Sequence, residues 1–131
     1  MRAWLDLHGL QFPKLILDNG AGLSRKTRIS AQEMGTLLRV AFDSPQMPEF
    51  ISSLPIAAVD GTMRKRLRED RVGGRAHIKT GSLDDVSTMA GYVLGRSGHR
   101  YAVVAFINHQ GVQSWQGKQV QDTLLRWVHA Q

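Results

Sequence analysis

Residues 75–108 read RAHIKTGSLDDVSTMAGYVLGRSGHRYAVVAFIN, and this stretch decides the fold of the chain. It holds three runs that favour β-structure, at about residues 75–80, 86–94 and 100–108. A Gly-Ser turn is expected after the first run, and residues 95–99 supply a hairpin loop between the last two. The sequence therefore predicts three consecutive antiparallel strands. Residues 101–107 are apolar on both faces, which indicates a strand that is central in its native sheet.

Helices are predicted on both sides of these strands. Residues 30–33, Ser-Ala-Gln-Glu, form a capping box, and the helix that follows has an apolar face of Met34, Leu37, Leu38 and Ala41. A closing helix at about residues 114–129 is expected to bury Val120, Leu124, Trp127 and Val128. A first helix, residues 3–10, is expected to turn inward Trp4, Leu7 and Leu10, with Gly9 as its C-cap.

The segment between the helical part and the strands is predicted to be irregular. Pro48 suits the first turn of a short helix that ends before Pro55, and residues 54–61 form a connector. One or two helical turns are expected at residues 62–67, before Gly73 and Gly74 interrupt the chain. The predicted fold is α+β: a three-stranded antiparallel sheet with a C-terminal helix packed on it and an N-terminal helical part.

Length and composition limit what this chain can be. The 131 residues, 42% hydrophobic and 21% charged, are typical of a single soluble globular domain. No run of about 18 apolar residues is present, which predicts no membrane span. The absence of cysteine excludes disulfides and thiolate metal sites, and the five histidines show no metal-ligand spacing. We therefore expect neither a metal nor a cofactor.

The chain is basic, with a formal net charge of +6 and a pI of about 10.3. The positive charge is concentrated in residues 64–71, Arg-Lys-Arg-Leu-Arg-Glu-Asp-Arg, which we interpret first as a solvated surface. An anionic partner is the alternative. Because no aromatic residue interrupts this run, recognition of nucleic acid by base stacking has little support.

The tripeptide Lys79-Thr80-Gly81 is the motif that carries chemistry. A Lys-Thr-Gly on a strand is one of three elements of serine acyltransferases that act on β-lactams. Lysine offers a fixed cation for a substrate carboxylate, the threonine hydroxyl binds that carboxylate, and glycine lets the substrate approach the backbone. The N–H of Ser82 would be an oxyanion donor. An ordinary strand that ends in a turn is the alternative interpretation.

Four segments in order resemble one family, the class C, type-4 penicillin-binding proteins, which are D-alanyl-D-alanine carboxypeptidase/endopeptidases. They are residues 18–25 (DNGAGLSR), residues 54–63 (LPIAAVDGTM) with the basic run that follows, residues 74–83 (GRAHIKTGSL), and residues 86–92 with the final strand and helix. The likeness covers nearly the whole chain. It implies that residues 1–131 are one domain, the C-terminal fragment of a penicillin-binding, transpeptidase-like domain.

The resemblance also implies roles for individual residues. Lys79 and Thr80 would bind the terminal carboxylate of a peptidoglycan stem peptide or a β-lactam, and Gly81 and Ser82 would line the oxyanion side. Asp18, Gly22 and Ser24 would belong to a loop near the site, and Arg25 would be a structural anchor. Ser24 itself is interpreted as a turn residue. The full-length family is periplasmic. Residues 1–9 do not have the features of a signal peptide, so for the chain as it stands the location is either cytoplasmic or unknown.

Two catalytic elements of that family are not in this sequence. No serine has a lysine three residues later, and neither asparagine, Asn19 or Asn108, follows a serine by two. Thr62-Met-Arg-Lys65 comes near the first pattern, but a threonine there fits a helix N-cap better. We therefore expect the nucleophile and its base to lie upstream of Met1 in a full-length relative, no catalytic residue in this chain, and no turnover by the chain alone. A non-catalytic module for peptides or acidic ligands and a basic nucleic-acid-binding module remain as alternatives.

The last strand raises a question of assembly. Residues 101–107 would present an unpaired apolar edge if nothing covers them, and neither proline nor charge interrupts that run. We expect the chain to self-associate through residues 100–108, and Val104→Lys to weaken the association. Cover from within the chain by residues 14–17, a short extended run, is the alternative.

Overall fold

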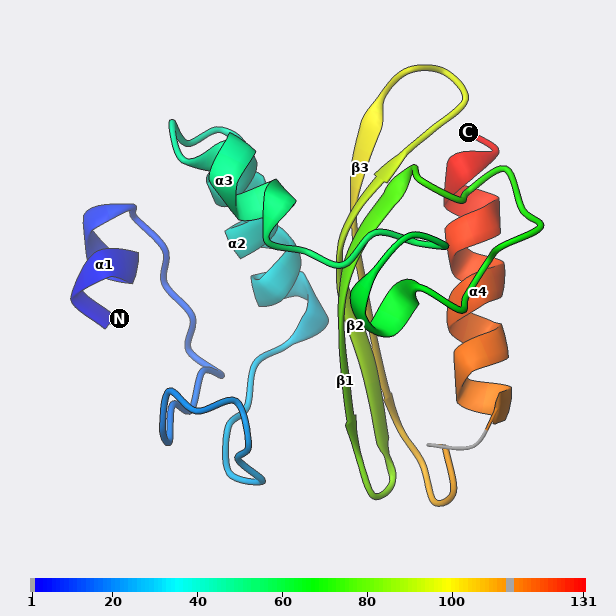
Figure 1. Cartoon of the computed structure of the whole chain (residues 1–131). Coiled ribbons are helices and arrows are strands. Elements are labelled where there is room, and N and C mark those ends of the chain that lie inside the picture. The colour runs from blue at the N-terminus through cyan, green and yellow to red at the C-terminus, as the bar shows by residue number, and fades with distance from the viewer. Residues whose placement is uncertain (1, 113–114) are drawn as a thin grey trace.

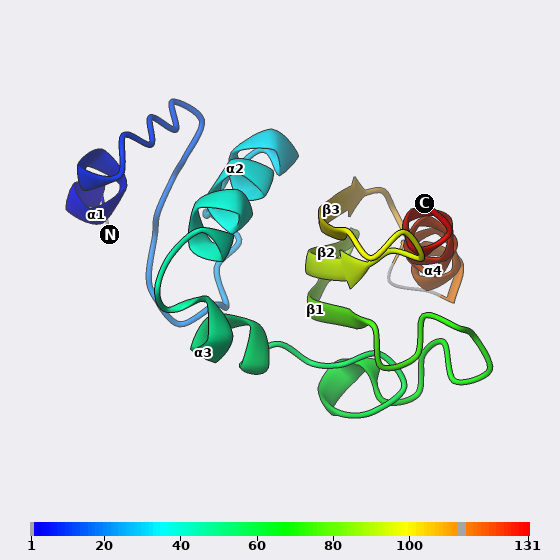
Figure 2. The same cartoon turned by 90° about the horizontal axis from the view of Figure 1, so that it is seen from above.

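A three-stranded antiparallel sheet, in the order β1–β2–β3, lies between two helical layers in the computed structural model, which describes residues 2–112 and 115–131 (Figures 1 and 2). The strands are β1 (Ala76–Leu83), β2 (Val86–Leu94) and β3 (Arg100–Asn108). Helix α4 (Trp115–His129) packs on one face. The other face carries α2 (Ala31–Phe42) and α3 (Met47–Ser52), with α1 (Arg2–Leu7) farther out. The α+β architecture predicted from the sequence is confirmed.

The predicted strands are present, but β1 is longer than expected. It continues three residues beyond Thr80, because Gly81 pairs with Thr88 and Ser82 pairs with Ser87. The predicted Gly-Ser turn is therefore wrong. The turn consists instead of Asp84 and Asp85, and Asp85 adopts a left-handed φ of +64°. The extension keeps the tripeptide Lys79-Thr80-Gly81, and Ser82 after it, on a strand.

The face under α4 holds the main core, which includes Ile78, Met89, Val93, Val103 and Leu125. The predicted buried stripe of α4 is only partly right. Val128 is buried and Leu124 is half-buried, but Val120 and Trp127 are 61% and 63% exposed. The helix instead buries Leu125 and Gln121, whose side-chain Nε2 donates to Ser87 Oγ at 3.0 Å. Ser114, the predicted start of this helix, lies outside the described residues.

Gly117 explains why α4 is rotated in this way. A Cβ on Gly117 would lie 2.2 Å from the carbonyl oxygen of Val112, so the helix meets the preceding segment at this glycine. Gln121 follows one turn later on the same side, because residues four apart lie on one helix face. The prediction that Val120 is buried used only the spacing of apolar residues, and therefore did not consider Gly117 or Gln121.

The opposite face of the sheet packs on α2 through Tyr92, Leu38 and Leu54. The Tyr92 hydroxyl donates to the Leu38 carbonyl oxygen at 2.5 Å. Burial, together with the charge of Asp43, raises the pKa of Tyr92 to about 12. The predicted capping box is confirmed, since Ser30 Oγ accepts from the Glu33 N–H at 3.1 Å and Glu33 Oε2 accepts from the Ser30 N–H at 2.9 Å. That backbone bond is the main reason the pKa of Glu33 lies below its usual value.

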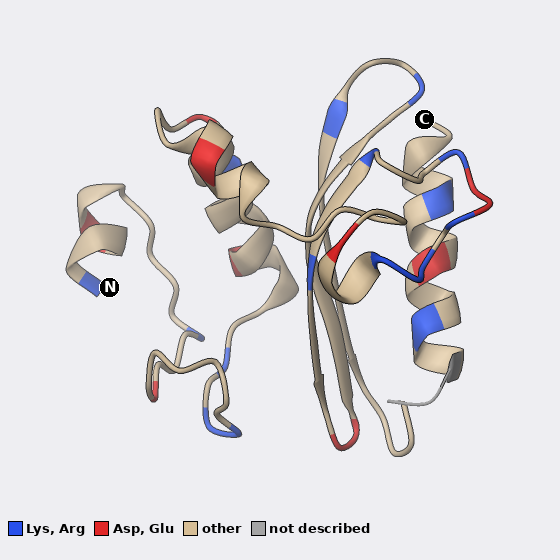
Figure 3. Ribbon diagram, in the orientation of Figure 1, with Lys and Arg blue, Asp and Glu red and all other residues tan. Residues whose placement is uncertain are grey.

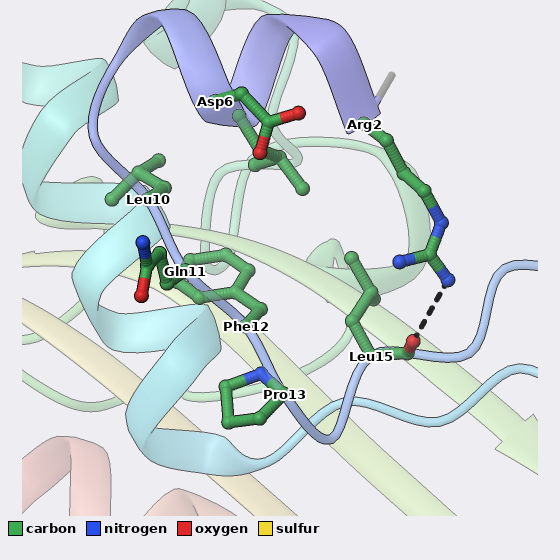
Figure 4. Close-up of a pocket in the computed structure, with 8 residues that line it drawn as sticks. Arg2, Asp6, Leu10, Gln11, Phe12, Pro13 and Leu15 are labelled. Carbon is green, nitrogen blue, oxygen red and sulfur yellow. Dashed lines mark hydrogen bonds between the residues drawn. The ribbon is translucent and has the colours of Figure 1, made fainter.

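The N-terminal part has a small apolar cluster of its own. Leu5, Leu10 and Leu15 are buried there, whereas Trp4 and Leu7 are exposed, so the predicted inward face of the first helix is wrong except for Leu10. The helix ends at Leu7, earlier than predicted, although Gly9 does adopt a left-handed φ of +66°. Beside the cluster lies a pocket of about 590 Å³ lined only by residues between 2 and 15 (Figure 4). None of these is a predicted site residue.

Residues 54–75, here called the connector, run from α3 to β1 along the edge of the sheet. The Ala57 N–H donates to the Ala76 carbonyl at 2.9 Å, and the Ile78 N–H donates to the Pro55 carbonyl at 2.7 Å. The expected helical turns at residues 62–67 are reduced to one 3-10 turn, Gly61–Met63. Two ion pairs, Arg66–Asp122 at 2.6 Å and Arg126–Asp70 at 3.0 Å, hold the connector against α4.

Candidate binding site at the edge of β1

The candidate site lies where the connector leaves the edge of β1. Connector residues pair with β1 only as far as Ile78, and no described residue forms a strand beside the rest of β1. In an antiparallel ladder, alternate residues direct their N–H and C=O groups to the same side. Because Ile78 donates outward to Pro55, the backbone groups of Thr80 and Ser82 also project outward. The N–H and C=O groups of Thr80 and Ser82 are therefore on an open strand edge.

Lys79 lies at the start of this open edge. Its side chain is on the α2 face of the sheet, on the same side as Ala90, its partner across the ladder. The ammonium Nζ donates to the Thr80 carbonyl oxygen at 2.8 Å, and the residue is exposed. The cation is therefore held at the strand edge and remains accessible to a ligand.

Thr80 and Ser82 face the other way, toward the connector. Thr80 Oγ1 donates to Thr62 Oγ1 at 2.8 Å. Both residues line an open pocket of about 450 Å³, which connector and α4 residues complete. Its polar lining consists of the side chains of Thr62, Arg64, Lys65, Arg66, Thr80, Ser82, Ser87, Thr88, Lys118 and Gln121. No carboxylate lines it, so the pocket is positively charged and rich in hydroxyl groups.

Arg66 fixes one wall of this pocket. Its guanidinium donates to Asp122 Oδ1 through Nε at 2.9 Å and Nη2 at 2.6 Å, and to Gln121 Oε1 through Nη1 at 3.3 Å. The Arg66 and Asp122 side chains are both mostly buried. Among the described residues, Arg64, Lys65 and Lys118 form no ion pair with a carboxylate. Arg66 therefore forms the wall, and these three residues supply its charge.

Gly81 has a structural reason to be glycine. A Cβ at this position would lie 2.6 Å from Thr88 Oγ1 on the neighbouring strand. Thr88 Oγ1 also lies 3.4 Å from the Gly81 carbonyl oxygen, to which it donates. A side chain at position 81 would therefore require the Thr88 side chain to shift, in addition to any effect on the approach of a ligand.

The predicted near-site loop is folded on itself. Ser24 Oγ donates to Asp18 Oδ2 at 2.7 Å and accepts the N–H groups of Lys26 and Thr27, which makes Ser24 a turn residue as its sequence indicated. Gly22 adopts a left-handed φ of +74°. Arg25 pairs with Asp84, in the turn after β1, at 3.1 Å. This exposed pair connects the loop to the end of β1 but adds little stability.

The sequence did not identify the connector side of the site. Residues 64–71 looked like one solvated run of charge, yet Arg66 is held by Asp122, which lies 56 residues away along the chain. No local pattern reports that contact. His77 Nδ1 lies 3.3 Å from the Ile51 carbonyl oxygen, and Asp84 and Asp85 form the turn after β1.

Two further observations concern residues 2–112 and 115–131 alone. No helix in these segments is long and apolar enough to cross a membrane. They also contain no group of three or more His, Cys, Asp or Glu side chains arranged to hold a metal ion.

Known proteins match this chain along most of its length. Residues 1–131 match the D-Ala-D-Ala carboxypeptidase 3 (S13) family. A D-alanyl-D-alanine carboxypeptidase of Actinomadura sp. (strain R39) is 32% identical over 108 residues, which cover 79% of this chain and 20% of that protein. The chain therefore spans about a fifth of the length of this curated relative.

Solved structures agree with the sequence match. The crystal structure of penicillin binding protein 4 (dacB) from Haemophilus influenzae superposes with a TM-score of 0.81 and 26% identity, over 95% of this chain and 30% of that chain. The same protein in complex with a novel β-lactam gives a TM-score of 0.77 and 32% identity, over 83% of this chain and 25% of that chain. The matched proteins give no support to a nucleic-acid-binding module or to a purely binding module.

Proposed function

The chain belongs to the D-Ala-D-Ala carboxypeptidase 3 (S13) family, and from this premise we propose that it carries the carboxylate-binding side of a serine acyl-transfer site. The ligand class is a peptidoglycan stem peptide that ends in D-Ala-D-Ala, or a β-lactam. The observation that carries the proposal is the open edge of β1 at residues 79–82. There a lysine ammonium is held at the edge from the α2 face, and the hydroxyl groups of Thr80 and Ser82 lie on the other face beside a cationic pocket. The outward-facing backbone groups of Thr80 and Ser82 lie between them.

An extended peptide would bind this edge as an added strand. Backbone N–H and C=O groups at Thr80 and Ser82 supply the ladder bonds that such a peptide needs, and side-chain pockets supply selectivity. The terminal carboxylate would be recognised by Lys79 and the Thr80 hydroxyl. The Ser82 N–H would then face the scissile carbonyl oxygen as a donor for the oxyanion.

Acyl transfer also needs an activated nucleophile, and we propose that these 131 residues do not contain it. A serine nucleophile requires a base within hydrogen-bonding distance. No serine in the sequence has the Ser-x-x-Lys spacing of this enzyme class. Residues 1–131 would therefore bind the peptide end without cleaving it, and a longer polypeptide would supply the nucleophile.

The proposal is tested by removing the cation from the edge. Lys79→Ala should weaken binding of a D-Ala-D-Ala peptide by about 1.5–3 kcal/mol, the usual cost of a lost hydrogen bond to a charged group. Isothermal titration calorimetry measures this difference. Lys14→Ala, a variant with the same loss of charge in the N-terminal part of the chain, should bind as the wild type does. Equal affinities for wild type and Lys79→Ala would remove the proposed role of the lysine.

A further inference from the structure

The pocket of about 450 Å³ beside β1 has an excess of positive charge that the proposed carboxylate site does not use. Arg64, Lys65 and Lys118 line it together with Arg66, and no described residue that lines it is Asp or Glu. Asp122 neutralises Arg66, because Arg66 Nε and Nη2 both donate to Asp122 Oδ1. Three cations therefore remain in this one pocket, whereas the proposed terminal carboxylate has the lysine of the strand edge as its own partner.

The chain brings these charges together against their mutual repulsion. Lys118 lies in the first turn of α4, where the helix dipole is positive, and that turn contains no acidic residue. The Lys118 carbonyl oxygen accepts from Arg66 Nη2 at 3.3 Å, so the first turn is tied to the connector. Figure 3 shows that the Lys and Arg residues after the 3-10 turn lie in the part of the connector that comes next to α4. Because like charges repel unless an anion lies between them, this arrangement favours an anionic ligand.

The pocket adjoins the place where the proposed peptide ends. Thr80 and Ser82 belong to the ligand-binding edge and also line the pocket. Toward the start of β1 the edge is closed, because the Ile78 N–H donates to the Pro55 carbonyl oxygen at 2.7 Å. An added strand that reaches Thr80 must therefore end there, which fits a free terminal carboxylate. Any further group on the terminal residue has to leave the edge, and the pocket lies beside it.

A pair of hydroxyl groups connects the edge with the pocket. Thr80 Oγ1 donates to Thr62 Oγ1 at 2.8 Å, and Thr62 belongs to the connector wall of the pocket. A hydroxyl group donates one hydrogen bond and accepts two. When Thr80 turns its proton to a carboxylate, Thr62 can therefore donate to Thr80 in return. The edge and the pocket can thus both hold an acidic group without leaving a hydroxyl group unsatisfied.

We propose that the pocket is a second carboxylate subsite, and that the preferred ligand is a peptide whose terminal residue carries an acidic group besides its terminal carboxylate. This inference rests on the proposed function, which places the terminal carboxylate at the edge of β1. Lys79 and Thr80 bind the first carboxylate, and the cations of the connector and α4 bind the second. All residues that line the subsite belong to the connector, β1, β2 and α4, so the subsite is complete within this chain.

Two peptides that differ in one charge test the proposal. Isothermal titration calorimetry compares binding of a peptide that ends in D-Ala-D-Glu with binding of the same peptide ending in D-Ala-D-Gln. The two terminal side chains have nearly the same shape, but only D-Glu adds a carboxylate. The D-Glu peptide should bind at least about tenfold more tightly, as expected for a hydrogen bond between charged groups. This preference should shrink at high salt, which screens the charges.

Two double variants locate the second carboxylate. Lys65→Gln combined with Lys118→Gln should remove most of the preference for D-Glu and leave binding of a D-Ala-D-Ala peptide little changed. Lys14→Gln combined with Arg96→Gln is the matched control: it removes the same charge from exposed positions outside the pocket, and should keep the preference. Circular dichroism shows that each variant is folded.

The outcomes separate this inference from the proposed function. Equal affinities for the D-Glu and D-Gln peptides, with D-Ala-D-Ala binding that still depends on Lys79, would overturn the second subsite alone. The charge of the pocket would then serve contacts with a longer polypeptide. A preference for D-Glu that survives the double substitution of Lys65 and Lys118 would also overturn the subsite. Binding of none of the three peptides would contradict the proposed function, and this inference with it.

Discussion

Gly91→Ala is expected to abolish the folded state of the chain. Gly91 lies in the central strand β2 opposite Ile78 and adopts a φ of +156°, a backbone conformation that side chains rarely allow. A Cβ there would lie 2.0 Å from the carbonyl oxygen of His77 and 3.0 Å from the Cα of Ile78. Both atoms belong to the backbone of β1, so relief requires that β1 and β2 separate. We expect a loss above about 4 kcal/mol, a large part of the stability of a domain.

Gly98→Ala is the control for this substitution. Gly98 also has a positive φ, +85°, but an added Cβ would meet nothing within 4 Å. Its cost should be that of backbone strain alone, about 1–2 kcal/mol. Urea unfolding followed by circular dichroism measures both variants. A loss for Gly91→Ala no greater than that for Gly98→Ala would mean that β1 and β2 do not approach as closely as described.

No covalent adduct is expected when the chain is incubated with a penicillin. Acylation requires a serine with an activating base, and the sequence has no Ser-x-x-Lys. Ser24 donates to the carboxylate of Asp18, and Ser87 accepts from Gln121, so neither hydroxyl is paired with a lysine or histidine base. Intact-mass spectrometry should show the unmodified mass of the protein after long incubation, whereas a full-length relative should gain the mass of one penicilloyl group.

A stoichiometric adduct would contradict the proposed absence of a nucleophile. The place to search would then be Ser97, whose Oγ lies 3.2 Å from His99 Nδ1 in the loop between β2 and β3. That loop is at the opposite end of the sheet from the turn that follows Ser82 (Figure 1). Modification of Ser97 would therefore be unrelated to the edge of β1. Ser97→Ala distinguishes the two cases by peptide mapping.

Much of the fold could be predicted because the signals are local. The strands β2 and β3 and the loop between them follow from β-forming runs separated by a Gly-rich segment, and their predicted bounds are confirmed. The capping box at Ser30 is also confirmed, since its two hydrogen bonds join residues three apart. Lys79-Thr80-Gly81 lies on strand β1 because it belongs to a β-forming run, which is also a local signal.

The predictions that were wrong concern residues whose placement depends on contacts between distant segments. Val120 and Trp127 fit an apolar stripe, but Gln121 is buried in their place because Ser87 and Arg66 satisfy its amide. Polar partners 34 and 55 residues away leave no periodic signal in the helix. Likewise, Gly81 reads as a turn residue until the contact with Thr88 is known. The sequence did not predict the cationic wall of the site, because that wall forms only when the connector packs against α4.

The central claim is that the open edge of β1 binds the free carboxylate end of a peptide. The most direct measurement is a titration of the 15N-labelled chain with a D-Ala-D-Ala peptide, followed by amide chemical shifts. We predict saturable shifts at Thr80 and Ser82. These shifts should weaken in Lys79→Ala, and with the same peptide carrying a C-terminal amide in place of the carboxylate. Shifts confined to other parts of the chain, or equal shifts with the amidated peptide, would contradict it.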